Sequence, residues 1–422
     1  MSKMGIKGIE ILLNYLTKSK IIKSISEVRY FNDDPKFYYY FAKLLLTKEH
    51  TDGFIDKALC SSGVSFVSRE SALLKCLGEA FERCSQELYR EENIKFTKAN
   101  AWPQEKFPLT LFSPILKKDS ILGYIEGFNI SRKNRVILPA GLVYLNYEKK
   151  ESEVNFNYPV VSTGAAGGFR YESAVLRGIY EVVERDAFMC GYLNSISFPM
   201  VDLEVLKDKG LSTVLESIKR YNLELFTFEA TNDLSIPCFV SILIDRTGLG
   251  PAVSVGAKAS LNCLEAIKGS IGETFILRNM IRAAMLSDNS KKRKIGSKLL
   301  SELNKRGLYW CPVSGIGRLN FLLNQKPQKK KFREFHRTEK ETLDYVVKIL
   351  KNRGFDVYCA DISSDLLKKV NYTVCKILIP GLQPLYLCES QKKFVDKKRL
   401  KQVADYFGVK DHKMNQIPHP FL

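Results

Sequence analysis

Four glutamates in two distant segments are the residues best suited to carry chemistry. Residues 79–83 read Glu-Ala-Phe-Glu-Arg, and residues 181–185 read Glu-Val-Val-Glu-Arg. Side chains three positions apart share a face of a helix, so each segment presents two carboxylates side by side. Because the neighbouring residues are largely apolar, these carboxylates repel one another unless a cation lies between them. Mg²⁺ takes oxygen ligands and leaves positions open for phosphate oxygens. We therefore predict a magnesium site built from Glu79, Glu82, Glu181 and Glu184.

A third segment and a glycine-rich turn extend this pattern. Glu273 lies in an otherwise apolar stretch over residues 261–285, for which we expect a helix. Residues 162–168 read Ser-Thr-Gly-Ala-Ala-Gly-Gly and precede a predicted helix over 171–193, where backbone N–H groups can hold phosphate. Three arginines follow the glutamates, and each either contacts phosphate or neutralises the acidic residues: Arg83, Arg185 and Arg278. The alternative interpretation is a set of amphipathic helices whose Glu and Arg form ordinary surface pairs.

Several common chemistries are excluded because their motifs are absent. The sequence has no GxxxxGK(S/T) phosphate loop, no HExxH and no GxSxG. The ten cysteines occur without CxxC spacing, so a zinc site is not expected. No apolar run reaches the roughly 18 residues of a membrane span, and the N-terminus lacks a secretory signal. We therefore expect a cytoplasmic protein with free thiols and no membrane partner.

The chain is strongly basic, with a formal net charge of +19. Such a charge predicts attraction to polyanions such as nucleotides, acidic peptides or nucleic acid. Much of it lies in lysine-rich runs at residues 291–294, 329–331 and 397–401, which are also typical of a solvated surface. A nucleic-acid-binding or accessory protein is thus an alternative, although no zinc finger, helix-turn-helix or RNP-type aromatic pattern supports it.

The elements that must position these residues mix helices and strands without strict alternation. This order favours an α+β fold over a doubly wound sheet. Besides the helices already named, we expect helices over 68–92, 342–352 and 398–407, and strands over 122–130, 135–147, 238–245, 355–361 and 373–379. We expect three parts: a helical N-terminal extension (1–55), a catalytic domain (56–413) and a proline-rich tail (414–422).

The ordered motifs resemble those of the YcaO family. Residues 162–187, with the second ExxER, are similar to its central motif, and residues 78–83 resemble its first ExxER helix. Glu273 with Arg278, the segment 374–384 and the tail resemble three further motifs, so the likeness spans about residues 57–422. The resemblance implies a mixed fold that binds ATP and Mg²⁺ without a phosphate loop. It implies that the following residues bind the cofactors: Glu79, Glu82, Arg83, Ser162, Glu181, Glu184, Arg185, Glu273 and Arg278.

The proline-rich tail is similar to that of the azoline-forming cyclodehydratases in this family. Their implied reaction cyclises Cys, Ser or Thr of a ribosomal precursor peptide to thiazoline or oxazoline, with ATP phosphorylating the amide oxygen. We expect the stiff tail to fold back, with the terminal carboxylate of Leu422, Pro418 and Pro420 acting in catalysis and Phe421 as an apolar anchor. The alternatives within the family are thioamide or amidine formation and a non-catalytic accessory role.

The resemblance also implies partners. Azoline-forming relatives depend on a leader-binding partner protein, and the expected extension over 1–55 is too short to contain such a module. We further expect a homodimer and, where rings are oxidised, a flavin dehydrogenase.

Four internal positions and the C-terminal residue depart from the family pattern. Ser62 stands before a glycine where many relatives carry lysine, and Lys75 stands where a serine often precedes the first ExxER helix. Phe169 replaces a small polar residue, and Gly269 stands where an arginine often faces phosphate. Lys268 is adjacent but points elsewhere on the helix, and the chain ends Phe-Leu rather than Phe-Pro. The nucleotide contacts are therefore where this chain differs from its family.

Overall fold

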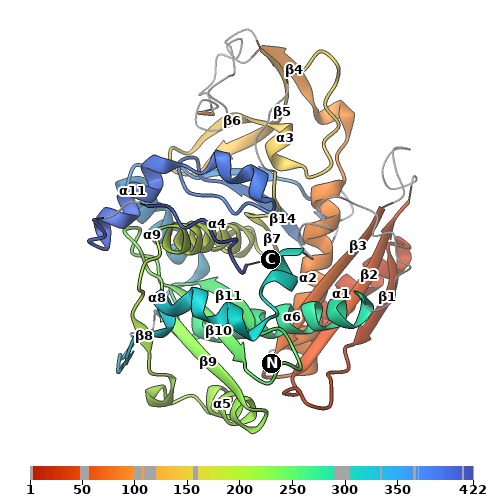
Figure 1. Ribbon diagram of the computed structural model, residues 1–422. Coiled ribbons are helices and arrows are strands. Elements are labelled where there is room, and N and C mark those ends of the chain that lie inside the picture. The colour runs from red at the N-terminus through yellow and green to blue at the C-terminus, as the bar shows by residue number, and fades with distance from the viewer. Residues whose placement is uncertain are drawn as a thin grey trace.

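The computed structural model describes residues 3–47, 57–98, 107–108, 120–154, 160–288, 305–332, 335–364, 367–368, 370–410 and 413–421. In this part of the chain the strands form three sheets. Three helices lie between the sheets: α2 (Arg69–Glu87), α4 (Tyr171–Leu193) and α6 (Cys263–Asp288) (Figure 1). Mixed helices and sheets confirm the predicted α+β class.

The N-terminal residues form a helix and two strands rather than the helical extension expected over 1–55. Helix α1 (Lys3–Lys18) precedes β1 (Ile22–Glu27) and β2 (Tyr38–Leu46), which join β3 (Lys57–Ser65) in an antiparallel sheet. The run Tyr-Tyr-Tyr-Phe-Ala-Lys-Leu-Leu-Leu in β2 is rich in aromatic residues, which favour a strand. Leu12 of α1 is fully buried in the same core as α2, so this region is an integral part of the fold.

A six-stranded sheet has the order β4-β5-β13-β14-β7, with β6 paired to β5. Its strands are β4 (Lys95–Lys98), β5 (Ile121–Asn129), β6 (Asn134–Pro139), β7 (Ala165–Gly168), β13 (Tyr358–Asp361) and β14 (Thr373–Leu378). The short helix α3 (Ala140–Val143) follows β6, where a longer strand was expected. The end of the glycine-rich turn is strand β7, which pairs antiparallel with β14.

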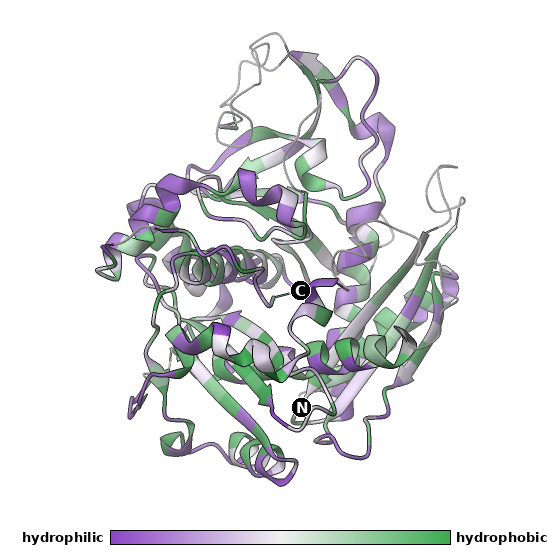
Figure 2. Ribbon diagram, in the orientation of Figure 1, coloured by the Kyte–Doolittle hydropathy of each residue, from purple (hydrophilic) through white to green (hydrophobic). Residues whose placement is uncertain are grey.

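A five-stranded sheet has the order β11-β10-β9-β8-β12. Its strands are β8 (Met200–Val201), β9 (Leu223–Glu229), β10 (Cys238–Asp245), β11 (Val253–Ala259) and β12 (Pro327–Gln328). The structure confirms the predicted strand over 238–245, and every residue of β10 is buried. Figure 2 shows how hydrophobic strands β9 and β10 are, which is why they form the centre of a core.

The three central helices each join two sheets. Helix α2 packs on β3 and β7. Helix α4 packs on β7 and β14 of one sheet and on β10 and β11 of another. Helix α6 packs on β10 and β11 and also on β3. Other helices lie farther out: α5 (Lys209–Arg220), α8 (Asn320–Leu323), α9 (Glu339–Asn352) and α11 (Lys397–Tyr406). Helix α4 has the predicted bounds, and α2, α6, α9 and α11 lie close to the predicted helices. In the described parts of the chain, no helix has the length and apolar character needed to cross a membrane.

Candidate active site

Helix α2 brings the first pair of glutamates against strand β3. Gly63 permits this approach, because a Cβ there would lie 2.2 Å from the carbonyl oxygen of Ala72. Glu79 accepts a hydrogen bond from the backbone N–H of Ser62 at 2.7 Å and one from the guanidinium of Arg83 at 2.7 Å. Ser62 orients Glu79 through its backbone, so the departure from lysine at this position leaves the contact intact.

Glu82 connects α2 to strand β7. Its Oε1 accepts a hydrogen bond from the backbone N–H of Gly167 at 2.8 Å. Desolvation raises the pKa of Glu82 to about 8; the hydrogen bond from Gly167 opposes the shift, and the carboxylates of Glu181 and Glu79 add to it. Glu82 and Glu181 are thus close enough to interact, which brings the two ExxER segments together.

The glycine-rich turn serves the glutamates directly. The backbone N–H of Gly164 donates to Oε2 of Glu181 at 3.1 Å, as that of Gly167 does to Glu82. Gly164 has φ +86°, and a Cβ there would lie 2.3 Å from the backbone oxygen of Ile377, so only glycine fits. We predicted from the sequence that the backbone N–H groups of this turn bind phosphate. In the structure these two N–H groups donate to carboxylates instead.

Lys376 of β14 fixes this turn; it belongs to the segment 374–384 that resembles a family motif, but no role was predicted for it. Its ammonium donates to the carbonyl oxygens of Val161 and Thr163, each at 2.7 Å. Desolvation lowers the pKa of Lys376 to about 8, and the carboxylate of Glu181 opposes the shift. Ser162 lies exposed between the two carbonyls, at the start of the turn. A single lysine in the apolar strand Thr-Val-Cys-Lys-Ile-Leu was the available signal.

Glu184 is the most unusual carboxylate of the site. Its side chain is 1% exposed, and neither oxygen has a hydrogen-bond partner. The nearest cations are Nη1 of Arg185 at 3.2 Å and Nζ of Lys258 at 3.8 Å. Desolvation raises the pKa of Glu184 to about 8, against the opposing effect of Lys258 and Arg185. A buried carboxylate without hydrogen bonds fits a site that a divalent cation completes.

Glu273 of α6 lies on the other side of Lys258. Nζ of Lys258 is 3.8 Å from Oε1 of Glu273, and the backbone N–H of Ala257 donates to Oε2 at 3.4 Å. Strand β11 therefore inserts a lysine between the carboxylates of α4 and α6. Lys258 was not predicted as a site residue, although it is the one charged residue in Val-Ser-Val-Gly-Ala-Lys-Ala.

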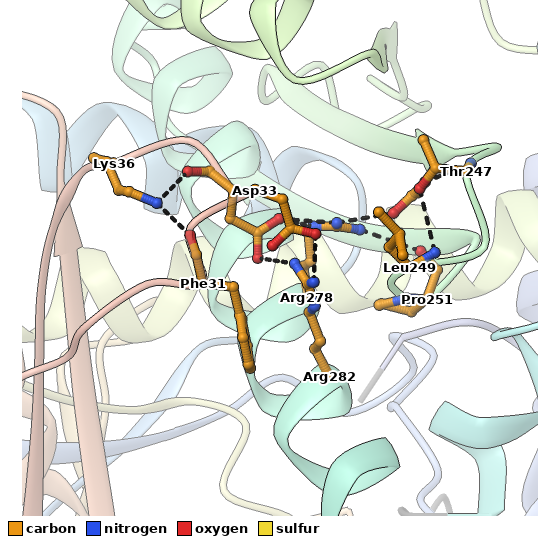
Figure 3. Close-up of polar contacts among 10 residues, drawn as sticks. Phe31, Asp33, Lys36, Thr247, Leu249, Pro251, Arg278 and Arg282 are labelled. Carbon is orange, nitrogen blue, oxygen red and sulfur yellow. Dashed lines mark hydrogen bonds and ion pairs between the residues drawn. The ribbon is translucent and has the colours of Figure 1, made fainter.

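Arg278 of α6 belongs to a separate group of charges (Figure 3). Its Nη2 lies 2.9 Å from Asp34 and 2.8 Å from Asp245, and its side chain is 4% exposed. Arg282, one turn further on, contacts Asp34 at 2.8 Å and Asp33 at 2.6 Å. We call these five residues the Arg278 network.

The prediction that Arg278 binds the nucleotide gains no support from this arrangement. Residues 273 and 278 are five positions apart, which places them about 140° apart around a helix. Glu273 therefore faces α4 while Arg278 faces the loop between β1 and β2. The structure gives Arg278 the neutralising role, toward aspartates that no sequence motif pointed to.

The C-terminal tail folds back onto α4, as expected. Phe421 is buried, and its ring centroid lies 4.2 Å from the guanidinium carbon of Arg185. The carbonyl oxygen of Pro418 accepts a hydrogen bond from the Tyr192 hydroxyl at 3.2 Å, and Pro420 is buried. Leu422 lies outside the described residues, so the position of the terminal carboxylate stays a prediction.

Five glutamates thus meet where α2, α4 and α6 come together. The carboxylates of Glu79 and Glu181 add to the raised pKa of Glu82, and those of Glu181 and Glu273 add to that of Glu184. We call the group the acidic junction: Glu79, Glu82, Glu181, Glu184 and Glu273. Within the described ranges, no three His, Cys, Asp or Glu side chains are arranged to hold a metal ion. The four-glutamate magnesium site therefore stays a prediction, which the unpartnered oxygens of Glu184 support.

Comparisons with known proteins identify the family. The family model described as YcaO cyclodehydratase, ATP- and Mg²⁺-binding, matches residues 66–383. An uncharacterized protein of Methanothermobacter thermautotrophicus is 23% identical over 325 residues, covering 75% of this chain and 80% of that protein. The chain belongs to the YcaO cyclodehydratase family. ATP and Mg²⁺ are the ligands of that family, which confirms the cofactor prediction.

Solved structures share the fold. A heterocyclase in complex with substrate and cofactor has a TM-score of 0.76 and 17% identity, covering 97% of this chain. The chain spans only 57% of that heterocyclase. YcaO from Methanopyrus kandleri, bound with AMPPCP and Mg²⁺, has a TM-score of 0.64 and 15% identity, covering 90% of this chain and 91% of its own.

Proposed function

We propose that this chain uses ATP to activate a backbone amide of a peptide and closes Cys, Ser or Thr side chains into azoline rings. Family membership supports the use of ATP and Mg²⁺. The observation that carries the proposal is Glu184, a buried carboxylate whose oxygens lack hydrogen bonds inside a group of five glutamates. Buried carboxylates of this kind are neutralised either by a proton or by a cation that completes the site, and the family's Mg²⁺ supplies such a cation.

The proposed reaction moves one amide oxygen to phosphate. The side-chain sulfur or oxygen of the peptide attacks the preceding amide carbon, and the amide oxygen takes the γ-phosphoryl group of ATP. Elimination then breaks the carbon–oxygen bond, so the products are the azoline, ADP and inorganic phosphate. An amide oxygen leaves poorly by itself, whereas phosphate is a good leaving group. The protein's main task is therefore to position phosphates and neutralise charge.

The residues of the acidic junction have distinct parts in this proposal. Glu79, Glu82, Glu181 and Glu184 would hold Mg²⁺, which would supply positive charge to the phosphates. The backbone N–H of Gly164 orients Glu181, so that carboxylate keeps one direction. Nε and Nη1 of Arg185 have no hydrogen-bond partner, which leaves donors for a phosphate oxygen.

The first test replaces Glu181 by glutamine. Glu181→Gln removes one charge from the acidic junction, and we expect ATP turnover to fall by about 10²-fold or more. The matched control is Glu216→Gln on the exposed side of α5, which should keep full activity. Calorimetry with AMPPCP and Mg²⁺, together with thermal unfolding, separates lost binding from lost folding. Normal turnover in Glu181→Gln would show that Glu181 is structural.

Mass spectrometry of the product separates azoline formation from the alternatives. An azoline lacks one water relative to the precursor, a thioamide exchanges oxygen for sulfur, and an amidine gains nitrogen in place of oxygen. The substrate to use is a Cys-, Ser- or Thr-rich precursor peptide, to be sought among the neighbouring genes. The tail that resembles the azoline-forming branch supports the first outcome.

We further propose that residues 56–413 form the catalytic domain and that the tail completes its site. The terminal carboxylate of Leu422, with Pro418 and Pro420, would orient the amide or accept its proton. The support is Phe421, which anchors the tail on Arg185 of the second ExxER segment.

The proposed partners follow from the same reaction. The substrate is a ribosomal precursor peptide, and a separate leader-binding protein presents it. A homodimer and a flavin dehydrogenase that oxidises the rings complete the proposal. A cytoplasmic location is supported by ten free cysteines, none of them in a disulfide.

A further inference from the structure

Lys258 lies between two carboxylates of the acidic junction, those of Glu184 and Glu273. Its Nζ lies 3.8 Å from both Glu184 and Glu273, and neither distance is short enough for a hydrogen bond. The side chain is 42% exposed, whereas that of Glu184 is 1% exposed. The ammonium therefore has donors to offer to a ligand that enters from solvent.

Gly269 makes the room that the stem of Lys258 fills. A Cβ at position 269 would lie 2.8 Å from Cγ of Lys258 and 3.2 Å from its Cβ and Cδ. No larger residue fits unless Lys258 turns away, since Cγ is close to the backbone and cannot shift alone. Lys268 does not replace it, because its ammonium is bound to Asp208 at 2.6 Å.

Lys75, which also departs from the family pattern, interacts electrostatically with Lys258. Its Nζ donates to the carbonyl oxygen of Val64 at 2.9 Å. Desolvation lowers the pKa of Lys75, and so does the charge of Lys258, which is therefore close enough to repel it. The carboxylate of Glu273 opposes this shift, and a phosphate that enters beside the two lysines adds further negative charge.

We propose that Lys258 contacts the nucleotide phosphates in this chain, and that Gly269 and Lys258 act as a matched pair. This inference rests on the proposed function and names a further residue of the same site. Lysine is a compact point charge suited to phosphate. The position of Gly269, four residues before Glu273, lets β11 supply the cation in place of α6.

The experiment measures binding of two nucleotides rather than turnover. AMPPCP with Mg²⁺ carries the full triphosphate chain, whereas AMP lacks the β- and γ-phosphates. Calorimetry is done on the full chain and on Lys258→Met, Gly269→Ala, Lys258→Ala and the double variant Lys258→Ala/Gly269→Ala. Lys268→Met is the matched control, since Lys268 is a neighbouring lysine paired elsewhere.

We expect Lys258→Met to weaken AMPPCP binding about tenfold and to leave AMP binding and thermal unfolding unchanged. Gly269→Ala should weaken AMPPCP binding as well, because its methyl group displaces Lys258. In the Lys258→Ala background the same methyl group should have no further effect. Lys268→Met should bind like the wild-type chain.

Two results would overturn the inference. If Lys258→Met binds AMPPCP as the wild-type chain does, or weakens AMPPCP and AMP equally, Lys258 is only a counter-ion of Glu184 and Glu273. If Gly269→Ala and Lys258→Ala weaken binding independently, the two residues are not a pair. A wild-type chain that fails to bind AMPPCP with Mg²⁺ overturns the proposed function itself, so the two failures are distinguishable.

Discussion

The acidic junction and the Arg278 network contain the same kinds of residue in opposite states. In the Arg278 network the ion pairs are 2.6 to 2.9 Å long and join α6 to the loop between β1 and β2. In the acidic junction Glu184 and Glu273 have their cations at 3.2 to 3.8 Å, and both oxygens of Glu184 lack hydrogen bonds. Every charge of the Arg278 network therefore lies in a short ion pair, although Oδ2 of Asp245 has no hydrogen bond, whereas Glu184 and Glu273 have only long ion pairs.

This difference shows which buried charges belong to the fold and which to the ligand. Buried ion pairs with short contacts and fixed geometry hold segments together, and breaking one partner leaves an uncompensated charge. Buried carboxylates with long contacts and raised pKa values destabilise the protein until a cation arrives. The two states predict opposite responses to neutralising one residue.

The largest expected effect is the loss of stability in Arg278→Met. Removing this guanidinium takes the ion pair away from buried Asp245 and leaves buried Asp34 paired with Arg282 alone. We expect the free energy of unfolding in urea to fall by about 3–5 kcal/mol. The control is Arg246→Met, whose pair with Glu224 is exposed and should contribute about 0–1 kcal/mol. Unchanged stability in Arg278→Met would remove the distinction between the two groups.

Glu184→Gln should raise the free energy of unfolding in metal-free buffer, whereas Arg278→Met lowers it. The pKa of Glu184 is raised from 4.5 to about 8, so the folded state binds a proton that the unfolded state has lost. The wild-type chain is therefore destabilised as pH rises from about 4.5 to 8, by at most about 1.4 kcal/mol per pH unit. Glutamine removes this term, and the variant should be the more stable protein at pH 8.

Urea denaturation between pH 5 and pH 8 with a chelator is the measurement for this contrast. Glu216→Gln serves as the control, because its exposed side chain should leave the pH dependence unchanged. A Glu184→Gln variant that is less stable than the wild-type chain at pH 8 would mean that Glu184 is fully compensated.

The sequence predicted the acidic junction better than the Arg278 network, for a physical reason. Glu79, Glu82, Glu181 and Glu184 repeat a local i, i+3 pattern on apolar helices, so each pair shares one helix face, and the shared motif suggested that the two pairs serve one site. Arg278 meets Asp34, which lies 244 residues away, and no local pattern encodes that contact. Long-range pairs of this kind are visible only once the chain is folded.

The strength of the local sequence pattern also explains which helices and strands were predicted and which were missed. Helix α4 and strand β10 were predicted with their exact bounds, because each is a long apolar segment with clear ends. Strand β11 was missed because Ser, Gly and Ala weaken its strand signal, and Lys258 was missed with it. Strands β1 and β2 were not predicted, because the helical pattern of α1 led us to expect a helical extension over the whole of residues 1–55.

The smallest expected effect concerns the C-terminal tail, where a buried histidine lies beside an arginine that forms an ion pair. His419 is fully buried, and its Nε2 lies 3.0 Å from Nη1 of Arg306, which pairs with Glu389 at 3.0 Å. Desolvation lowers the pKa of His419 well below 6.5, and the charges of Arg306 and Arg185 add to this effect. The ring is therefore neutral in the folded protein while the unfolded chain takes up a proton at mild acid pH.

Acidification should consequently loosen the tail before it affects the acidic junction. With a depressed pKa in the folded state, His419 contributes fully above pH 6.5, and its contribution falls by up to about 1.4 kcal/mol per pH unit below that value. The buried Trp310, whose Nε1 donates to the Pro418 carbonyl, reports tail release by fluorescence. His419→Gln should lose this acid-dependent change, whereas the exposed His336→Gln should keep it. An identical acid profile in His419→Gln would mean that the tail is held by Phe421 and Pro418 alone, with no contribution from a neutral histidine.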